Sequence, residues 1–130
     1  MLRLTLMAGL LGLGLCDRDE TIAAYGAADQ VWVLVELDGA KFAPRATLKF
    51  PEPGRISGHA PCNTFQGAQD APYPWFDVKQ VAATRMACPD LAAETAYLAA
   101  LSDMTLSEVS GNTLILSNES GREMVFKASG

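Results

Sequence analysis

The sequence predicts a small α+β domain that is mostly β: a curved antiparallel sheet or a partly open β-barrel, with one α-helix packed on it. Short runs rich in β-branched and aromatic residues recur between turns that contain glycine, proline or asparagine. One segment, residues 89–104, is instead rich in alanine and leucine and contains no glycine. With 130 residues, of which 49% are hydrophobic and 19% charged, the chain has room for one domain with a single core.

Residues 1–15 have the pattern of a signal peptide. Arg3 supplies a positive charge, and an apolar run from Leu4 to Leu15 follows it. As a helix this run would rise about 18 Å, which is short of the ~30 Å hydrocarbon core, so we do not expect it to span a membrane. The run ends at Cys16 in the sequence LGLC, which resembles the lipobox of bacterial lipoproteins. That resemblance implies that Cys16 becomes the acylated first residue of the mature protein.

Ordinary secretion is the alternative, with cleavage after the small residues of AAYGAA and loss of Cys16. Both interpretations place the domain in the cell envelope, facing the periplasm, and the first one anchors it in a membrane through the lipid. Residues 16–29 are polar and alanine-rich and are predicted to form a lipidated N-terminus and a tether. The folded domain is predicted to span residues 30–128.

The expected strands, in chain order, cover residues 31–37, 46–50, 55–58, 75–81, 104–109, 112–117 and 123–128. The first, VWVLVEL, is rich in β-branched residues and ends at the turn signal Asp38-Gly39. The fourth, WFDVKQV, alternates apolar and polar residues, as a half-buried strand does. The last three are separated by SGN and NESGR, so they predict a meander of two hairpins.

The helix is expected over residues 89–104. Pro89 suits the first helical position, and Asp90 suits the positive end of the helix dipole. Glu94 lies on the stripe that must be buried against the sheet, and a buried carboxylate needs a partner. Arg85 is the nearest candidate upstream. The same stripe carries three leucines, Leu91, Leu98 and Leu101.

Charge and motif content exclude several function classes. The formal net charge is −5 and the ten basic residues are scattered singly, whereas a nucleic-acid partner would require clustered lysine and arginine. No phosphate-binding loop and no carboxylate pair with acid–base spacing is present in the folded part, so we expect no cofactor. Its aromatic residues are expected to build the core rather than a ligand cage: Trp32, Phe50, Phe65, Trp75, Phe76, Tyr97 and Phe126.

Two cysteines remain once Cys16 is assigned to the signal. Cys62 and Cys88 form an even pair in an exported domain, and a disulfide between them is the simplest interpretation. The loop that it would close is about 27 residues long, for which chain entropy gives roughly 3.5 kcal/mol of stabilisation. Such a bridge would hold the start of the helix against the strand and turn around Cys62.

Catalytic and metal-binding alternatives depend on the single histidine, His59. His59 could act as a base toward Cys62, but Pro61 lies between them and no glycine-rich nucleophile elbow is present. Together, His59, Cys62 and Cys88 would supply three metal ligands, whereas a closed zinc site needs four. We therefore expect neither a catalytic nor a metal site, and we expect His59 to be a turn or surface residue.

Several motifs, taken in order, resemble the META domain, or HslJ-like, family of bacterial envelope proteins. They are W-x-L at 32–34, ATLKF at 46–50, ISGHAPCNTFQG at 56–67, VAATRMACP at 81–89, ExxYLxAL at 94–101, NTLILS and MVFKA. The C-N-x-F-x-G and T-R-M-x-C blocks are the most specific, because each holds several rarer residue types at fixed spacing. These motifs supply the expected structural residues around the bridge: Asn63, Phe65, Gly67, Thr84, Arg85 and Glu94.

The resemblance implies a non-enzymatic, exported lipoprotein whose fold is a small barrel-like sheet with one helix. It further implies a protein- or ligand-binding module linked to stress or antibiotic tolerance, with another envelope protein or a small apolar ligand as its partner. A carrier for lipids or other hydrophobic ligands is the alternative, because a half-open barrel could accept an acyl chain. A cysteine-dependent hydrolase that uses Cys62 and His59 is a weaker alternative.

Overall fold

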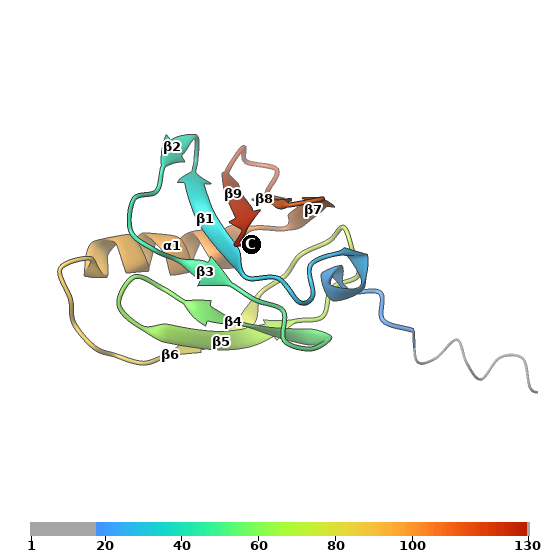
Figure 1. Cartoon of the computed structure of the whole chain (residues 1–130), viewed down its shortest axis with the longest axis horizontal. Coiled ribbons are helices and arrows are strands. Elements are labelled where there is room, and N and C mark those ends of the chain that lie inside the picture. Colours follow the sequence, from blue (N-terminus) through green and yellow to red (C-terminus); the bar gives the residue numbers. More distant parts are fainter. Residues whose placement is uncertain (1–17, 130) are drawn as a thin grey trace, which may run out of the picture.

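The computed structural model describes residues 18–129 (Figure 1). The predicted signal peptide and Cys16 lie outside the described residues. The elements in chain order are the 3₁₀-helix η3 (Ile22–Tyr25), β1 (Trp32–Leu37), β2 (Ala40–Lys41), β3 (Thr47–Leu48), β4 (Gly54–His59), β5 (Thr64–Gln69), β6 (Lys79–Ala83), α1 (Leu91–Asp103), β7 (Leu106–Ser110), β8 (Thr113–Ser117) and β9 (Glu123–Ala128). The predicted fold class, mostly β with one α-helix, is confirmed.

The strands form two open antiparallel sheets rather than a closed barrel. The larger sheet has the order β2–β1–β9–β8–β7, with β3 also paired to β1, and the smaller one has the order β4–β5–β6. Isolated bridges link the sheets at two places, Lys49 with Ser57 and Trp75 with Leu106. In Figure 1 the small sheet lies below the large one, and α1 crosses the view horizontally at the height where the two sheets meet.

Apolar side chains from both sheets and α1 meet in a single core. Alternate residues of β1 point inward, so that Trp32 and Leu34 are buried, and α1 contributes the buried Tyr97 and Leu101. Each large side chain that is fully buried contributes about 1.5–3 kcal/mol relative to exposure. The Tyr97 hydroxyl donates a hydrogen bond to the backbone carbonyl of Thr47 at 2.8 Å, which ties the helix to β3.

At Gly58 the two sheets approach each other closely. A Cβ atom at this position would overlap the carbonyl oxygen of Thr47. The neighbouring His59 donates its backbone N–H to the Thr47 hydroxyl at 2.9 Å. A residue without a side chain is therefore needed where β4 crosses β3.

The predicted elements differ from the observed ones mainly between residues 57 and 83. The stretch 57–67 was expected to be a strand end and a turn, but it contains most of the β4–β5 hairpin. The strand expected over 75–81 begins only at Lys79, because the preceding segment bonds to the other sheet. Phe76 donates to the carbonyl of Thr105 at 2.9 Å, and Ser107 donates to that of Pro74 at 2.8 Å. The short β2 was not expected, whereas the C-terminal meander forms as predicted.

One of the aromatic residues that were expected in the core does not lie there. Six of the seven aromatic residues expected there are buried, but the side chain of Trp75 is 55% exposed. The next residue in the chain, Phe76, is buried instead. The turn at Pro72 directs the chain so that only one of these two neighbouring rings can point inward; within it, Trp75 donates to the Pro72 carbonyl at 2.8 Å.

The N-terminal part of the described chain is packed onto the domain. Ile22 and Ala27 belong to the core, although they stand in a segment without helical or strand periodicity. The indole of Trp32 donates to the Ala27 carbonyl at 3.0 Å, and the backbone of Tyr73 donates to Glu20 at 2.8 Å. The folded body therefore begins at Glu20 rather than at residue 30, and any tether is shorter than the predicted 16–29.

Candidate functional site

The loop before α1 is fastened to the β4–β5 turn by a disulfide. Cys62 follows β4, Cys88 precedes α1, and their Cα atoms are 5.7 Å apart in the bonded pair. The cysteine count predicts the same pairing. The bridge defines one end of the candidate site, where the small sheet meets the first turn of the helix.

Asn63 lies next to the bridge and connects three segments through its side chain. Its Nδ2 donates to the Met86 carbonyl at 3.0 Å and to Glu94 Oε2 at 2.6 Å. Its Oδ1 accepts hydrogen bonds from the Thr84 hydroxyl at 2.9 Å and the Met86 backbone at 2.6 Å. Both donors and both acceptor positions of the amide are used, so its orientation is fixed.

Glu94 is the buried carboxylate of this network, with 5% of the residue exposed. Its Oε1 accepts the backbone N–H groups of Cys62 at 2.9 Å and Asn63 at 2.7 Å. Burial alone would raise the pKa of Glu94, but the hydrogen bonds from the Asn63 side chain and from these two backbone groups outweigh it and lower the pKa. The carboxylate is therefore held in its charged form by neutral donors.

The predicted pairing of Glu94 with Arg85 is wrong. Arg85 is exposed, and no ion pair between these two side chains occurs among the described residues. Thr84 and Met86, on either side of it, both bond to Asn63, which leaves Arg85 facing solvent. The carboxylate is satisfied not by a cation but by the N–H groups of Cys62 and Asn63, the first two residues of the C-N-x-F-x-G block.

Phe65 and Gly67 support the same region from β5. The Phe65 ring is buried and packs edge-on against Tyr97 of α1, with the ring centroids 5.8 Å apart. A Cβ atom at Gly67 would lie 3.1 Å from the Lys79 carbonyl, closer than ordinary contacts allow. Both residues therefore serve packing between β5, β6 and the helix.

An open groove lies above this network, between β6 and α1, with a volume of about 420 Å³. Its polar part is lined by Asn63, Thr84, Arg85 and Glu94. Two of its apolar residues are unusually exposed for their size, Met86 at 65% and Leu91 at 43%. Leu91 was expected in the core, but it lies at the outer end of its stripe. The apolar lining consists of Val81, Ala83, Met86, Ala87, Leu91 and Leu98.

One wall of the groove is the free edge of the small sheet. β6 is the last strand in the order β4–β5–β6. Thr84 donates its N–H toward β5, to Thr64 at 3.1 Å, and Ala83 stands opposite Phe65 in the register. Because backbone groups alternate in direction along an antiparallel strand, the N–H and C=O of Ala83 point away from β5. The groove is thus flanked by unpaired strand backbone.

The residues of the catalytic and metal-binding alternatives are not arranged for either chemistry. His59 is exposed at the end of β4, and the sulfur of Cys62 is bonded to Cys88. A cysteine nucleophile requires a thiolate, which a disulfide does not provide. Among residues 18–129, no group of three or more His, Cys, Asp or Glu side chains is placed to hold a metal ion. Over the same range, no helix is both long and apolar enough to cross a membrane.

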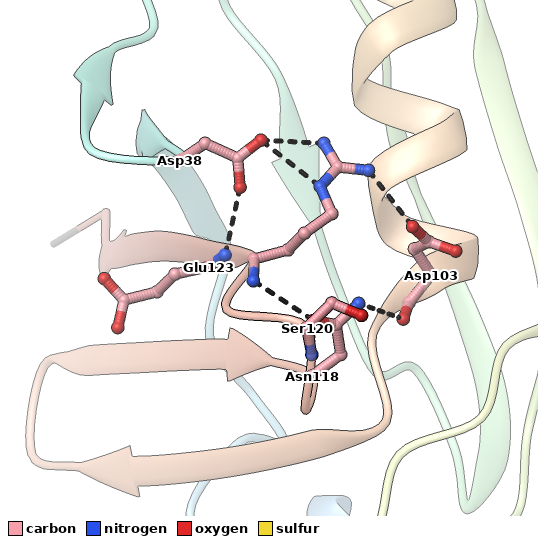
Figure 2. Close-up of polar contacts among 6 residues, drawn as sticks. Asp38, Asp103, Asn118, Ser120 and Glu123 are labelled. Carbon is pink, nitrogen blue, oxygen red and sulfur yellow. Dashed lines mark hydrogen bonds and ion pairs between the residues drawn. The ribbon is translucent and has the colours of Figure 1, made fainter.

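A second polar cluster, shown in Figure 2, fastens the loops at another edge of the domain. Arg122 bonds to Asp38 through Nη2 at 2.8 Å and through Nε at 3.2 Å, and its Nη1 reaches Asp103 at 3.2 Å. The hydrogen bonds from Arg122 and from the Glu123 backbone lower the pKa of Asp38. The cluster joins the β1–β2 turn, the end of α1 and the β8–β9 turn, so its role is structural.

Comparison with known proteins agrees with the fold and the motifs. The family model described as META domain matches residues 26–130. An NMR structure of a protein from Burkholderia xenovorans is 26% identical and has a TM-score of 0.63, covering 82% of this chain and 86% of that one. A DUF4847 family protein from Bacteroides vulgatus shares the fold at 13% identity and a TM-score of 0.67, covering 81% of this chain and 96% of that one. No curated protein shows significant similarity to the chain.

Proposed function

The chain belongs to the META domain family, and from that premise we propose that it is a non-enzymatic binding module of the bacterial cell envelope. Its partner is an extended, apolar segment of another envelope protein, which binds in the groove between β6 and α1. The observation that carries this proposal is the exposed apolar lining of the groove beside the unpaired edge of β6.

The groove has the two features that strand addition requires. Outward backbone groups of β6 can pair with an added strand, and the apolar part of the groove can receive alternate side chains of that strand. Met86 is flexible and polarisable, which suits contacts with side chains of varied shape. The disulfide and the Asn63–Glu94 network hold the wall behind the groove, so binding requires little further ordering.

We do not propose a catalytic role for the groove. The META domain family is not a known enzyme family, and the sulfur of Cys62 is engaged in the disulfide. Carriage of a lipid between the sheets is also disfavoured, since large side chains such as Trp32, Phe65 and Phe126 occupy that space. A lipid bound in the surface groove would instead be detected as a lipid-mass adduct in the crosslinking experiment.

The proposal includes export and anchoring through Cys16, with the domain facing the periplasm. Intact mass spectrometry of the mature protein from cells, with and without reductant, measures the cleavage site, acylation of Cys16 and the state of Cys62 and Cys88. A mature chain that begins at an acylated Cys16 and contains one disulfide supports it. Cleavage after residues 23–28, without acylation, would favour the secreted form.

Photo-crosslinking in intact cells tests the binding function. Benzoyl-phenylalanine placed at Met86 is expected to form an adduct with a discrete envelope protein, and peptide mapping should locate the crosslink in an extended apolar segment. The same group at Glu119, an exposed position in the β8–β9 turn, serves as the control and should give no such adduct. A lipid-mass adduct at Met86 would favour the carrier, and no adduct specific to Met86 would contradict the proposal. We also propose the link to antibiotic tolerance that the family resemblance implies: a deletion strain should be more sensitive to antibiotics than the wild type, and equal sensitivity would contradict the link.

A further inference from the structure

The large apolar side chains exposed in the described part of the chain fall into two pairs. Met86 and Leu91 border the groove, whereas Tyr25 and Trp75 are 50% and 55% exposed at another place. The second pair is not used by the proposed function. Tyr25 belongs to η3, and Trp75 closes the turn at Pro72, which bridges to Thr21 just before η3.

The two aromatic residues are held in place by the fold. The Tyr25 ring stacks on the ring of Tyr73, with the centroids 4.7 Å apart and the planes within 13°. Tyr73 is fixed in turn, because its hydroxyl accepts the Val109 N–H at 3.0 Å. Trp75 follows two residues later in the same turn. This end of the domain, defined by Tyr25, Tyr73 and Trp75, is called the aromatic end below.

The aromatic end is also where the folded chain begins. Glu20 is bonded to Tyr73 through the backbone. Glu20 follows Cys16 by only four positions, and a fully extended chain over four residues reaches about 14 Å. The headgroup region on each side of a bilayer is roughly 6 Å thick. A lipid on Cys16 would therefore hold the aromatic end at or next to the membrane surface.

From this geometry we infer that the aromatic end is a membrane-docking surface, with Tyr25 and Trp75 seated in the headgroup region of the bilayer. The inference rests on the proposed anchoring through Cys16. Tyrosine and tryptophan favour this region because their rings are apolar at one end and polar at the other. A short link to the anchor also keeps the local concentration of lipid high, so even a weak contact is populated.

The charges around the aromatic end indicate how it binds. A pocket that includes Thr21 and Pro72 lies beside the aromatic end. It is lined by Arg18 and by acidic residues that include Glu20 and Asp70. Among the described residues, the lining of this pocket has one arginine against three carboxylates, Asp19, Glu20 and Asp70, so attraction to anionic lipids is not expected and docking depends on the aromatic rings. Salt screens the repulsion between these carboxylates and anionic lipids, so the contact should persist or strengthen as salt rises, whereas an electrostatically attractive contact weakens.

Docking at this end would leave the groove accessible. Figure 1 shows the blue turn of η3 and the loop around residue 75 at one end of the long axis, and the start of α1 at the opposite end. The groove residue Leu91 is the first residue of α1, so this part of the groove lies at that opposite end. A domain resting on its aromatic end would present the groove toward the periplasm.

Tryptophan fluorescence of the mature protein, reconstituted into vesicles of phosphatidylethanolamine and phosphatidylglycerol, tests the inference. Trp75 is exposed and Trp32 is fully buried, so quenching by aqueous iodide reports on Trp75. We expect this iodide quenching to be lost in vesicles and quenching by lipids brominated near the headgroup to appear. Trp75→Phe should abolish both signals, and Met86→Ser, at the groove, should leave them unchanged.

Flotation of the vesicles separates the two ways in which the inference can fail. Protein that floats with the vesicles while Trp75 stays open to iodide would overturn docking and leave the anchor intact. Protein that does not float, together with a mature mass lacking acyl chains, would overturn the proposed anchoring and the docking with it. Bromolipid quenching that disappears at high salt would overturn the aromatic mode of contact.

Discussion

At Glu94 a buried carboxylate is stabilised by three neutral donors, two backbone N–H groups and the side-chain amide of Asn63. Hydrogen bonds to a charged group contribute more than neutral ones, about 1.5–3 kcal/mol each. The acceptor side of the Asn63 amide is occupied by Thr84 and Met86. Glu94 and Asn63, both residues of the motif blocks, therefore act as one unit that fixes the turn beside the disulfide.

Replacing Glu94 with glutamine is expected to lower the free energy of unfolding by about 1–3 kcal/mol. The new amide would place its nitrogen against Nδ2 of Asn63, and Asn63 cannot rotate without losing both of its own acceptor contacts. Urea unfolding measures the change. Arg85→Gln is the matched control and should stay within about 0.5 kcal/mol of the wild type, as exposed positions do. Equal losses for the two variants would indicate that Glu94 depends on Arg85 after all.

Acid should destabilise the fold partly through Glu94. Its pKa is lower in the folded protein than the ordinary 4.5, so its stabilising effect is complete above about pH 4.5 and is lost as the pH falls through the folded pKa. The urea midpoint of the wild type should drop on acidification in that window, and the drop should be smaller in Glu94→Gln. Asp38 is shifted in the same direction, so some acid sensitivity remains in the variant. An unchanged pH profile would contradict the assignment.

At the scale of elements, the disulfide joins a hairpin turn to a helix whose first turn carries Glu94. The Cys62–Cys88 bridge spans a sequence separation of 26 residues. It restricts the unfolded chain, while the Asn63–Glu94 network stabilises the folded one. The disulfide and the hydrogen-bond network act at the same junction by different means, so each can be removed by mutation without removing the other.

The double variant Cys62→Ala/Cys88→Ala is expected to lose roughly 3.5 kcal/mol of unfolding free energy, the value that chain entropy gives for this loop. The fold should persist, because the hydrogen bonds of Asn63 and Glu94 do not involve the sulfur atoms. Chemical denaturation with and without reductant measures the difference. Reductant should destabilise the wild type and leave the double variant unchanged. Insensitivity of the wild type to reductant would show that the bridge is not formed.

The Arg122 cluster connects two turns and the end of α1 at a partly exposed edge (Figure 2). Exposed ion pairs contribute up to about 1 kcal/mol, so Arg122→Gln should change global stability by little. Hydrogen exchange should instead become faster in the β8–β9 turn, and the loop before α1 should be unaffected. Faster exchange in both places would mean that the cluster also supports the groove.

At the scale of the whole molecule, much of the fold follows from local patterns. The C-terminal meander and α1 have clear periodicity and turn residues, and both form where expected. The order and pairing of the N-terminal strands depend on long-range contacts, so the β4–β5 hairpin was missed. The packing of Ile22 and the exposure of Trp75 are likewise decided by the tertiary structure, because neither has a local signal.

The candidate site was predictable in its parts but not in its arrangement. The cysteine pair and the motif residues around Asn63 can be read from the sequence. The groove cannot, because it arises where Leu91 and Met86 stay exposed beside the free edge of β6. A leucine on a helical stripe normally indicates core, and only the position of the sheet edge shows otherwise.

Strand addition at β6 is the central claim, and a pair of proline variants tests it most directly. Ala83→Pro removes an N–H that points away from β5, so the fold should be retained, whereas Ala82→Pro removes one that faces β5 and should be destabilising. With benzoyl-phenylalanine at Met86, the crosslinked protein should disappear in the Ala83→Pro variant while its thermal midpoint stays near that of the wild type. An undiminished crosslink in a folded Ala83→Pro variant would contradict the claim.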